Sequence, residues 1–194
     1  MKTKEMMFAA LFAAFIGVLG LIPPIPLGFI PVPITLQTLG VMLAGGFLGR
    51  KIGTISIVLF MVMVALGLPL LSGGRGGLSV FVAPATGYLL SWPVAVFCIG
   101  YMTEKVWSSL KTWKLFAVNF VFGVVLISLI GAPVMALMTN TSIWAGLLGA
   151  TAFLPGDCLK AIVASLIIMQ IKALSPIEEK VDTAKVEGSV HVNI

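Results

Sequence analysis

Charged residues are scarce in this sequence: Asp, Glu, Lys and Arg make up 10% of its 194 residues, against about 25% in soluble globular domains. No charged residue occurs within residues 6–49, 52–74, 76–103 or 115–156. A helix needs only about 20 apolar residues to cross a bilayer, so the two longest stretches each have room for two crossings. With 59% hydrophobic residues and a mean hydropathy of +1.14, the composition excludes a soluble domain and predicts an integral membrane protein.

The residue types that most enzymes and metal sites require are also scarce. The chain has one histidine, His191, near its end, and two cysteines, Cys98 and Cys158, in apolar stretches. This leaves no plausible Ser-His or Cys-His catalytic pair, no His-Glu-x-x-His metal motif and no expected structural disulfide. The Gly-x-x-x-x-Gly-Lys-[Ser/Thr] loop that binds ATP is missing as well. We therefore expect neither an enzyme nor a bound metal or cofactor.

Dividing the apolar stretches at Pro and Gly clusters predicts six spans, at about residues 6–22, 34–48, 52–71, 81–102, 115–138 and 143–171. Apolar residues run consecutively instead of alternating, which excludes a membrane β-barrel. The predicted fold is an all-α integral membrane protein with six transmembrane helices in one domain, residues 1–174. A polar tail, residues 175–194, has no apolar periodicity, and we expect it to be largely unstructured.

Positive charge predicts the orientation of these spans. If they are threaded alternately, ten of the 12 Lys and Arg residues fall on one side, and cytoplasmic ends collect such charge. We therefore expect a multi-pass protein of the cell membrane with both termini in the cytoplasm, and no nucleic-acid partner is needed to explain its basic character. The first 22 residues resemble a secretory signal, but without a convincing small-x-small cleavage site we interpret them as the first helix.

Two segments on the predicted outer side lack the pattern of a regular helix. Residues 23–33 hold five prolines yet are apolar, so we interpret them as a flap packed over the helix ends, with a plain connecting loop as the alternative. Residues 72–77 place four glycines around Arg75. Glycine permits close backbone approach, so Gly74 and its neighbours could bend around a ligand that Arg75 binds. A flexible surface turn would have the same sequence.

Three charged residues, Arg75, Asp157 and Lys160, lie well inside apolar sequence. A charge in the bilayer costs about 2.5–3.5 kcal/mol even on lenient scales, so such residues tend to have a function. Asp157 and Lys160 are three residues apart and share one helix face. If Arg75 meets them, the site carries one surplus positive charge that a small carboxylate could neutralise. The alternative is that the pair only neutralises itself inside the bundle.

Other side chains predict a pocket and a docking face. Gln37 in the second span and Tyr88 in the fourth could contact a polar heterocycle and its apolar parts, although each is individually more often an anchor or packing residue. The first span contains small residues at helical spacing, which permit close approach of another helix. Docking of a partner and internal packing explain this stripe equally well; its members are Ala9, Ala10, Ala13 and Ala14.

Taken together, the sequence resembles the BioY family, the biotin-binding S components of energy-coupling factor (ECF) transporters. The resemblance covers residues 6–172. It rests on Gly28-Phe-Ile-Pro-Val-Pro-Ile-Thr-Leu-Gln37, the glycine loop 73–77, Gly87-Tyr-Leu-Leu90, and Leu154-Pro-Gly-Asp157 followed by Lys160.

This resemblance implies a six-helix S component that captures biotin from outside the cell. It also implies that the alanine stripe docks on a transmembrane coupling protein, which joins two cytoplasmic ATPases. The predicted substrate-binding residues are Gln37, Gly74, Arg75, Tyr88, Asp157 and Lys160, with Lys160 and Arg75 as candidates for the carboxylate of biotin. An S component for another anionic vitamin and a non-transporting membrane scaffold remain as alternatives.

Overall fold

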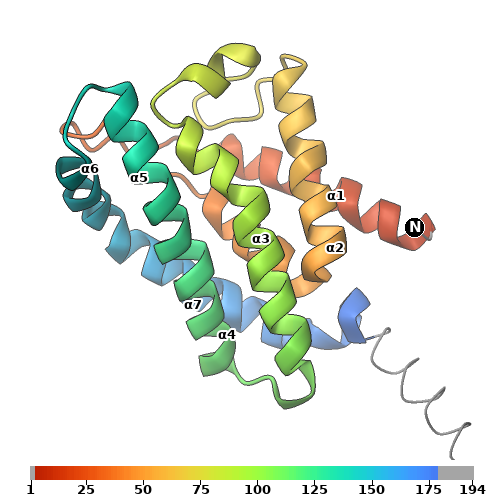
Figure 1. Cartoon of the computed structure of the whole chain (residues 1–194). Coiled ribbons are helices and arrows are strands. Elements are labelled where there is room, and N and C mark those ends of the chain that lie inside the picture. Colours follow the sequence, from red (N-terminus) through yellow and green to blue (C-terminus); the bar gives the residue numbers. More distant parts are fainter. Residues whose placement is uncertain (1–2, 179–194) are drawn as a thin grey trace, which may run out of the picture.

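The computed structural model describes residues 3–178 as a bundle of helices, with isolated β-bridges but no β-strand in that range (Figure 1). The α-helices are α1 (Thr3–Gly20), α2 (Gln37–Ala65), α3 (Thr86–Val106), α4 (Thr112–Val118), α5 (Leu126–Met138), α6 (Ile143–Ala150) and α7 (Leu154–Gln170). A π-helix, Asn119–Val125, joins α4 to α5, and a 3-10 turn, Thr151–Phe153, joins α6 to α7.

Four helical segments within the described residues are long and apolar enough to cross a membrane: Thr3–Gly20, Gln37–Ala65, Thr112–Met138 and Ile143–Gln170. The prediction of an all-helical membrane protein is thereby confirmed. The predicted ends agree with the observed ones to within a few residues, except at residues 66–85. There the observed helix of the third predicted span ends at Ala65 instead of residue 71, and that of the fourth begins at Thr86 instead of residue 81. The cause is Gly67, at a φ of 100°, and the turns that follow it.

Helix α2 is broken at Gly49, where the backbone has a φ of 78° and a ψ of 177°. The predicted second and third spans are therefore the two arms of this one element. The arms fold back on each other: a Cβ on Gly53 would lie only 2.7 Å from the carbonyl oxygen of Ala44. A residue with a side chain would be strained at this φ, so glycine is what permits the turn.

One end of the bundle is covered by two irregular segments, residues 21–36 and 66–85. In the first, Ile25 and Ile34 pair through two backbone hydrogen bonds of 2.9 Å. Ile30 and Val32 are buried in an apolar cluster with residues of α5 and α6. The predicted flap is thus packed onto the helices, and Figure 1 shows it beside α6.

The opposite end gathers the basic residues. Arg50 forms an ion pair of 3.1 Å with Glu104 and lies over the ring of Tyr101. Lys172 donates a hydrogen bond of 3.1 Å to the carbonyl oxygen of Trp107 and lies over its ring. The Gly49 break in α2 and the C-terminal ends of α3 and α7 therefore meet at the end of the bundle away from the flap.

The chain continues past α7 along this charged end. The hydroxyl of Ser175 donates a 2.5 Å hydrogen bond to the carbonyl oxygen of Phe47, just before the break in α2. Ile177 is 3% exposed, and the indole N–H of Trp107 donates to the Glu178 carboxylate. The packed part of the chain thus includes residues 175–178, whereas residues 179–194 of the predicted tail lie outside the described residues.

Candidate ligand-binding site

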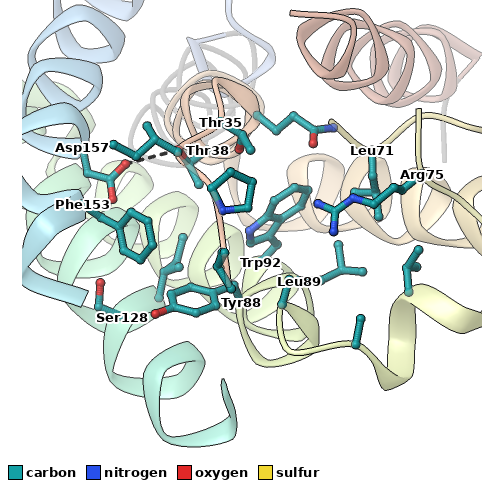
Figure 2. A pocket seen from close by; sticks show the side chains of 18 of the residues that line it. Thr35, Thr38, Leu71, Arg75, Tyr88, Leu89, Trp92, Ser128, Phe153 and Asp157 are labelled. Carbon is teal, nitrogen blue, oxygen red and sulfur yellow. Dashed lines mark hydrogen bonds between the residues drawn. The ribbon is translucent and has the colours of Figure 1, made fainter. Parts of the chain in front are cut away.

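A cavity of about 90 Å³ lies beneath the covering segments, between the ends of α2, α3, α5 and α7. Its walls are mostly apolar, and three of its lining side chains are charged. The side chains that matter for the site are shown in Figure 2. Residues that line the cavity include Thr35, Gln37, Thr38, Leu71, Arg75, Tyr88, Leu89, Trp92, Ile127, Ser128, Phe153, Asp157 and Lys160.

The buried ion pair of the cavity comes from the first two turns of α7. Pro155 suits the start of the helix, because proline lacks the backbone N–H that would have no partner there and its φ is already helical. Asp157 in the first turn is favoured by the helix dipole. The ammonium of Lys160 lies 2.7 Å from Oδ1 of Asp157, with side-chain exposures of 8% and 14%. It also donates to the hydroxyl of Thr38 on α2, over 3.0 Å. Within the described residues, the second carboxylate oxygen of Asp157 makes no hydrogen bond.

Arg75 lines a different part of the same cavity. Figure 2 places its guanidinium on the opposite side from Asp157, with Trp92 and Leu89 between them. Its Nε donates a 3.1 Å hydrogen bond to the carbonyl oxygen of Ser72. Among residues 3–178 no carboxylate lies within ion-pair distance of it. The free positive charge of the cavity therefore resides on Arg75.

This arrangement corrects the expectation that all three charges meet. Arg75, Asp157 and Lys160 line one cavity, but only Asp157 and Lys160 touch. The reason is that a buried ammonium requires a close counter-charge, and the residue three positions earlier on the same helix supplies it. The surplus positive charge is at the other side of the cavity, and an apolar and aromatic wall separates the two polar regions.

Of two further residues predicted to bind the ligand, Gln37 lines the cavity and Gly74 does not. Gln37 lines the cavity and is 2% exposed, but its amide bonds to the carbonyl oxygens of Ile16 and Leu70 and to Ser72. Gly74 does not line the cavity. It is exposed in the turn that precedes Arg75, with a φ of 69°.

The aromatic wall is formed by Tyr88 and Trp92 on α3 and by Phe153. The rings of Tyr88 and Phe153 meet edge to face at 5.8 Å. Trp92 is 5% exposed. Neither the Tyr88 hydroxyl nor the Trp92 indole N–H has a hydrogen-bond partner among the described residues, although both are buried. A buried donor without a partner costs about 1–3 kcal/mol, which a ligand or water would recover.

Some lining residues carried no signal strong enough to be chosen from the sequence. Ile127 and Ser128 lie on α5, a helix without any charged residue, so nothing distinguished the pocket face from the lipid face. Thr38 is separated by more than 100 residues from the pair that it bridges. Thr86 and Ser91 on α3 do not line the cavity, and their hydroxyls bond to nearby carbonyl oxygens of the chain.

The alanine stripe of α1 is divided between two faces of the helix. Ala9 and Ala13 are 2% and 0% exposed and pack inside the bundle. Ala10 and Ala14 are exposed on the other side of the helix. Only the second pair is accessible to a partner in this structure.

Comparisons with known proteins agree on one family. The model of the BioY family matches residues 1–176. The biotin transporter BioY of Rhizobium etli is 42% identical over 172 residues, covering 86% of this chain and 92% of the relative. The biotin transporter BioY of Lactococcus lactis subsp. cremoris is 39% identical over 173 residues, covering 88% and 92%.

A solved structure is also similar. It is the crystal structure of the S-component for biotin from an ECF-type ABC transporter, with a TM-score of 0.86 and 37% sequence identity. The match covers 89% of this chain and 95% of that one. Sequence family, relatives and fold therefore lead to the same conclusion: the chain belongs to the BioY family.

Proposed function

We propose that this chain is the biotin-binding membrane subunit of a vitamin uptake transporter, which captures biotin outside the cell and delivers it with an ECF ATPase module. Support comes from its relatives, which are named biotin transporters, and from the similar structure of an S-component for biotin. Because these relatives are transporters, the family is not a family of enzymes. The second candidate, another anionic vitamin, would use the same cavity.

The division of the cavity into two polar regions is the observation that carries the proposal. Biotin has a cyclic urea with two N–H donors at one end, a thioether ring in the middle and a carboxylate on an alkyl chain. Asp157 presents an unused carboxylate oxygen at one side of the cavity, and Arg75 presents an unpaired guanidinium at the other. A molecule with donors at one end and an acid at the other is complementary to both.

The proposed ligand pose follows from this complementarity. The urea N–H groups donate to Asp157, and the ammonium of Lys160 holds that carboxylate in place. Arg75 binds the carboxylate of biotin, a charge-assisted contact that a guanidinium can make with two N–H groups. Between them, the thioether ring and the alkyl chain pack against Tyr88 and Trp92. Lys160, paired as it is, serves the urea end and not the acid end.

The membrane arrangement is part of the proposal. The two arms of α2 and helix α3 each cross the membrane, as do α1, the α4–α5 segment and the α6–α7 segment, which makes six crossings. The basic end around Arg50 and Lys172 faces the cytoplasm. The cavity and its covering flap then face the outside, and both termini are cytoplasmic.

The remaining partners are a transmembrane coupling protein and two cytoplasmic ATPases. The chain has no ATP-binding loop, so it depends on a separate motor. We assign the docking contact to Ala10 and Ala14, because small exposed side chains let another helix approach closely. Ala9 and Ala13 instead allow close packing of α1 inside the bundle.

Binding of biotin to the purified protein tests the proposal. We expect the wild type to bind biotin, desthiobiotin to compete, and lipoate, folate and riboflavin to compete poorly. Lys160→Met should weaken binding by at least about tenfold, because it removes the partner that orients Asp157. Isothermal titration calorimetry on detergent-purified protein measures both effects.

Lys114→Met is the matched control, since Lys114 bonds to Ser109 near the basic end and lies far from the cavity. It should leave biotin affinity unchanged. Wild-type protein that binds folate or riboflavin in place of biotin would favour another vitamin, and no small-molecule binding at all would favour a scaffold. Unchanged affinity in Lys160→Met would disprove the role given to the buried pair.

A further inference from the structure

The amide of Gln37 has used every hydrogen bond that it can make. Its Nε2 donates to the carbonyl oxygens of Ile16 and Leu70, at 3.2 and 3.0 Å. Its Oε1 accepts from the backbone N–H and the hydroxyl of Ser72, at 3.1 and 3.2 Å. A side-chain amide offers two donors and two lone pairs, so nothing remains for a ligand, although Gln37 lines the cavity.

These bonds fasten the segment that carries Arg75. Leu71 and Arg75 close a short turn through two backbone hydrogen bonds, at 3.0 and 3.2 Å. Ser72 lies inside this turn. Its backbone N–H donates to Gln37, and its carbonyl oxygen accepts a hydrogen bond from Nε of Arg75. A continuous chain of hydrogen bonds therefore runs from Gln37 through Ser72 to the guanidinium.

The tip of this turn makes few contacts with the rest of the protein. Gly73 and Gly74 form its tip with φ values of 81° and 69°, and both are exposed. A Cβ at Gly74 would meet nothing within 4 Å, and one at Gly73 would reach only Pro24. The turn is therefore anchored on both sides of its tip: Leu71 and Ser72 are 9% and 1% exposed, and just after the turn the backbone N–H of Gly77 donates to the carbonyl oxygen of Val64 over 2.8 Å.

We propose that Gln37 is a positioning residue, which holds the turn of residues 71–75 so that Arg75 is oriented in advance for the acid group of the ligand. This rests on the proposed function, in which Arg75 binds the carboxylate of biotin. A guanidinium on a loosely held glycine turn would have to be ordered on binding, and ordering a flexible side chain and loop lowers affinity. Gln37 removes that cost without touching the ligand.

The test compares biotin with biotin amide, whose neutral end cannot form an ion pair with Arg75. Gln37→Met keeps the length and apolar volume of the side chain but cannot make the four bonds. We expect it to weaken biotin binding about tenfold and amide binding by less than about twofold. In an Arg75→Ala background, Gln37→Met should have no further effect on biotin beyond about twofold.

A second measurement reports on the turn directly. The backbone N–H of Ser72 donates to Gln37, so its hydrogen exchange should be faster in Gln37→Met while exchange within α3 stays unchanged. Gln170→Met, at the far end of α7, is the matched control and should alter neither binding nor exchange. If Gln37→Met does not fold, Gln37→Asn, which is too short to reach Ser72, takes its place.

Equal losses for biotin and the amide would overturn the inference, because Gln37 would then act on the ring or on the fold as a whole. Wild-type affinity in Gln37→Met or Gln37→Asn would overturn it too. Failure of the wild type to bind biotin would instead contradict the proposed function. The two failures are therefore distinguishable.

Discussion

At the scale of single residues, Tyr88 and Trp92 each bury a polar atom that has no hydrogen-bond partner among the described residues. Both lie on α3, one helical turn apart, and both face the cavity. A hydroxyl and an indole N–H without partners are unfavourable in an apolar wall. A ligand with acceptor atoms would restore these bonds, and the wall would then contribute specificity as well as apolar contact.

Trp92→Phe tests this contribution, because it keeps an aromatic ring but removes the N–H donor. If the proposed biotin site is correct, biotin affinity should fall about three- to tenfold, the range expected for losing one buried hydrogen bond. Titration calorimetry in detergent measures the change. Ser91→Ala is the control, since that hydroxyl bonds within α3 and does not line the cavity; wild-type affinity in Trp92→Phe would show that water satisfies the indole.

The sequence could predict which charges belong to the site but not how they pair. Arg75, Asp157 and Lys160 were recognisable because charge is rare in apolar stretches. Asp157 and Lys160 could be placed together because helix geometry relates them locally. The separation of Arg75 from this pair depends on how residues 66–85 fold over the bundle, and no local pattern encodes that. The bonds of Gln37 depend in the same way on tertiary contacts with α1 and the turn.

At the scale of helices, close packing of α3 against α5 shapes the aromatic wall. Gly131 of α5 lies directly against the ring of Tyr88, where any Cβ would overlap the ring atoms. Gly87 of α3 is packed in the same way against Val134. The two glycines let the helices approach, and this approach fixes the position of the Tyr88 ring in the cavity wall.

Gly131→Ala should therefore lower stability by about 1–3 kcal/mol through overpacking and should weaken ligand binding by displacing Tyr88. Thermal unfolding of the purified protein, with and without ligand, measures both. Gly149→Ala on α6 is the matched control, because its Cβ would contact Ile30 at an ordinary 3.4 Å. It gains helix propensity instead, so a Gly131→Ala protein as stable as Gly149→Ala would contradict this account of the interface.

The positions of the helices were largely predictable, since apolar length and Pro-Gly punctuation mark their ends. Helix α7 begins at Leu154, directly before Pro155 and Gly156, a pair of the kind that marks such ends. The sharp turn within α2 was predicted only as a boundary between two spans. Its form depends on Gly49, whose backbone is left-handed, and on the contact of Gly53 with Ala44. Such a contact between arms is visible only in three dimensions.

At the scale of the whole molecule, helix α1 has one face packed inside the bundle and another face turned outward. Ala13 is fully buried, whereas Ala14 is exposed beside it. The sequence alone presented four equivalent alanines, because periodicity shows that residues share a stripe but not which side of the stripe is already covered. The structure divides them, and this division makes a docking test specific.

Ala14→Trp should prevent copurification with the coupling protein and leave biotin affinity unchanged, because the indole blocks close helix approach far from the cavity. Pull-down of the assembled transporter, followed by a binding measurement on the isolated subunit, checks both parts. Leu166→Trp, on an exposed position of α7, is the control and should assemble normally. Full assembly of the Ala14→Trp protein would move the docking contact to another face.

The short stretch after α7 has a practical consequence for anyone who shortens or fuses this protein. Ser175 caps the α2 carbonyl group beside the Gly49 turn, Ile177 covers that turn, and Glu178 reaches the Trp107 indole. Trimming the gene at the last residue of the helical bundle would uncover the turn that lets α2 reverse. An affinity tag or reporter is therefore better joined after a spacer beyond Glu178.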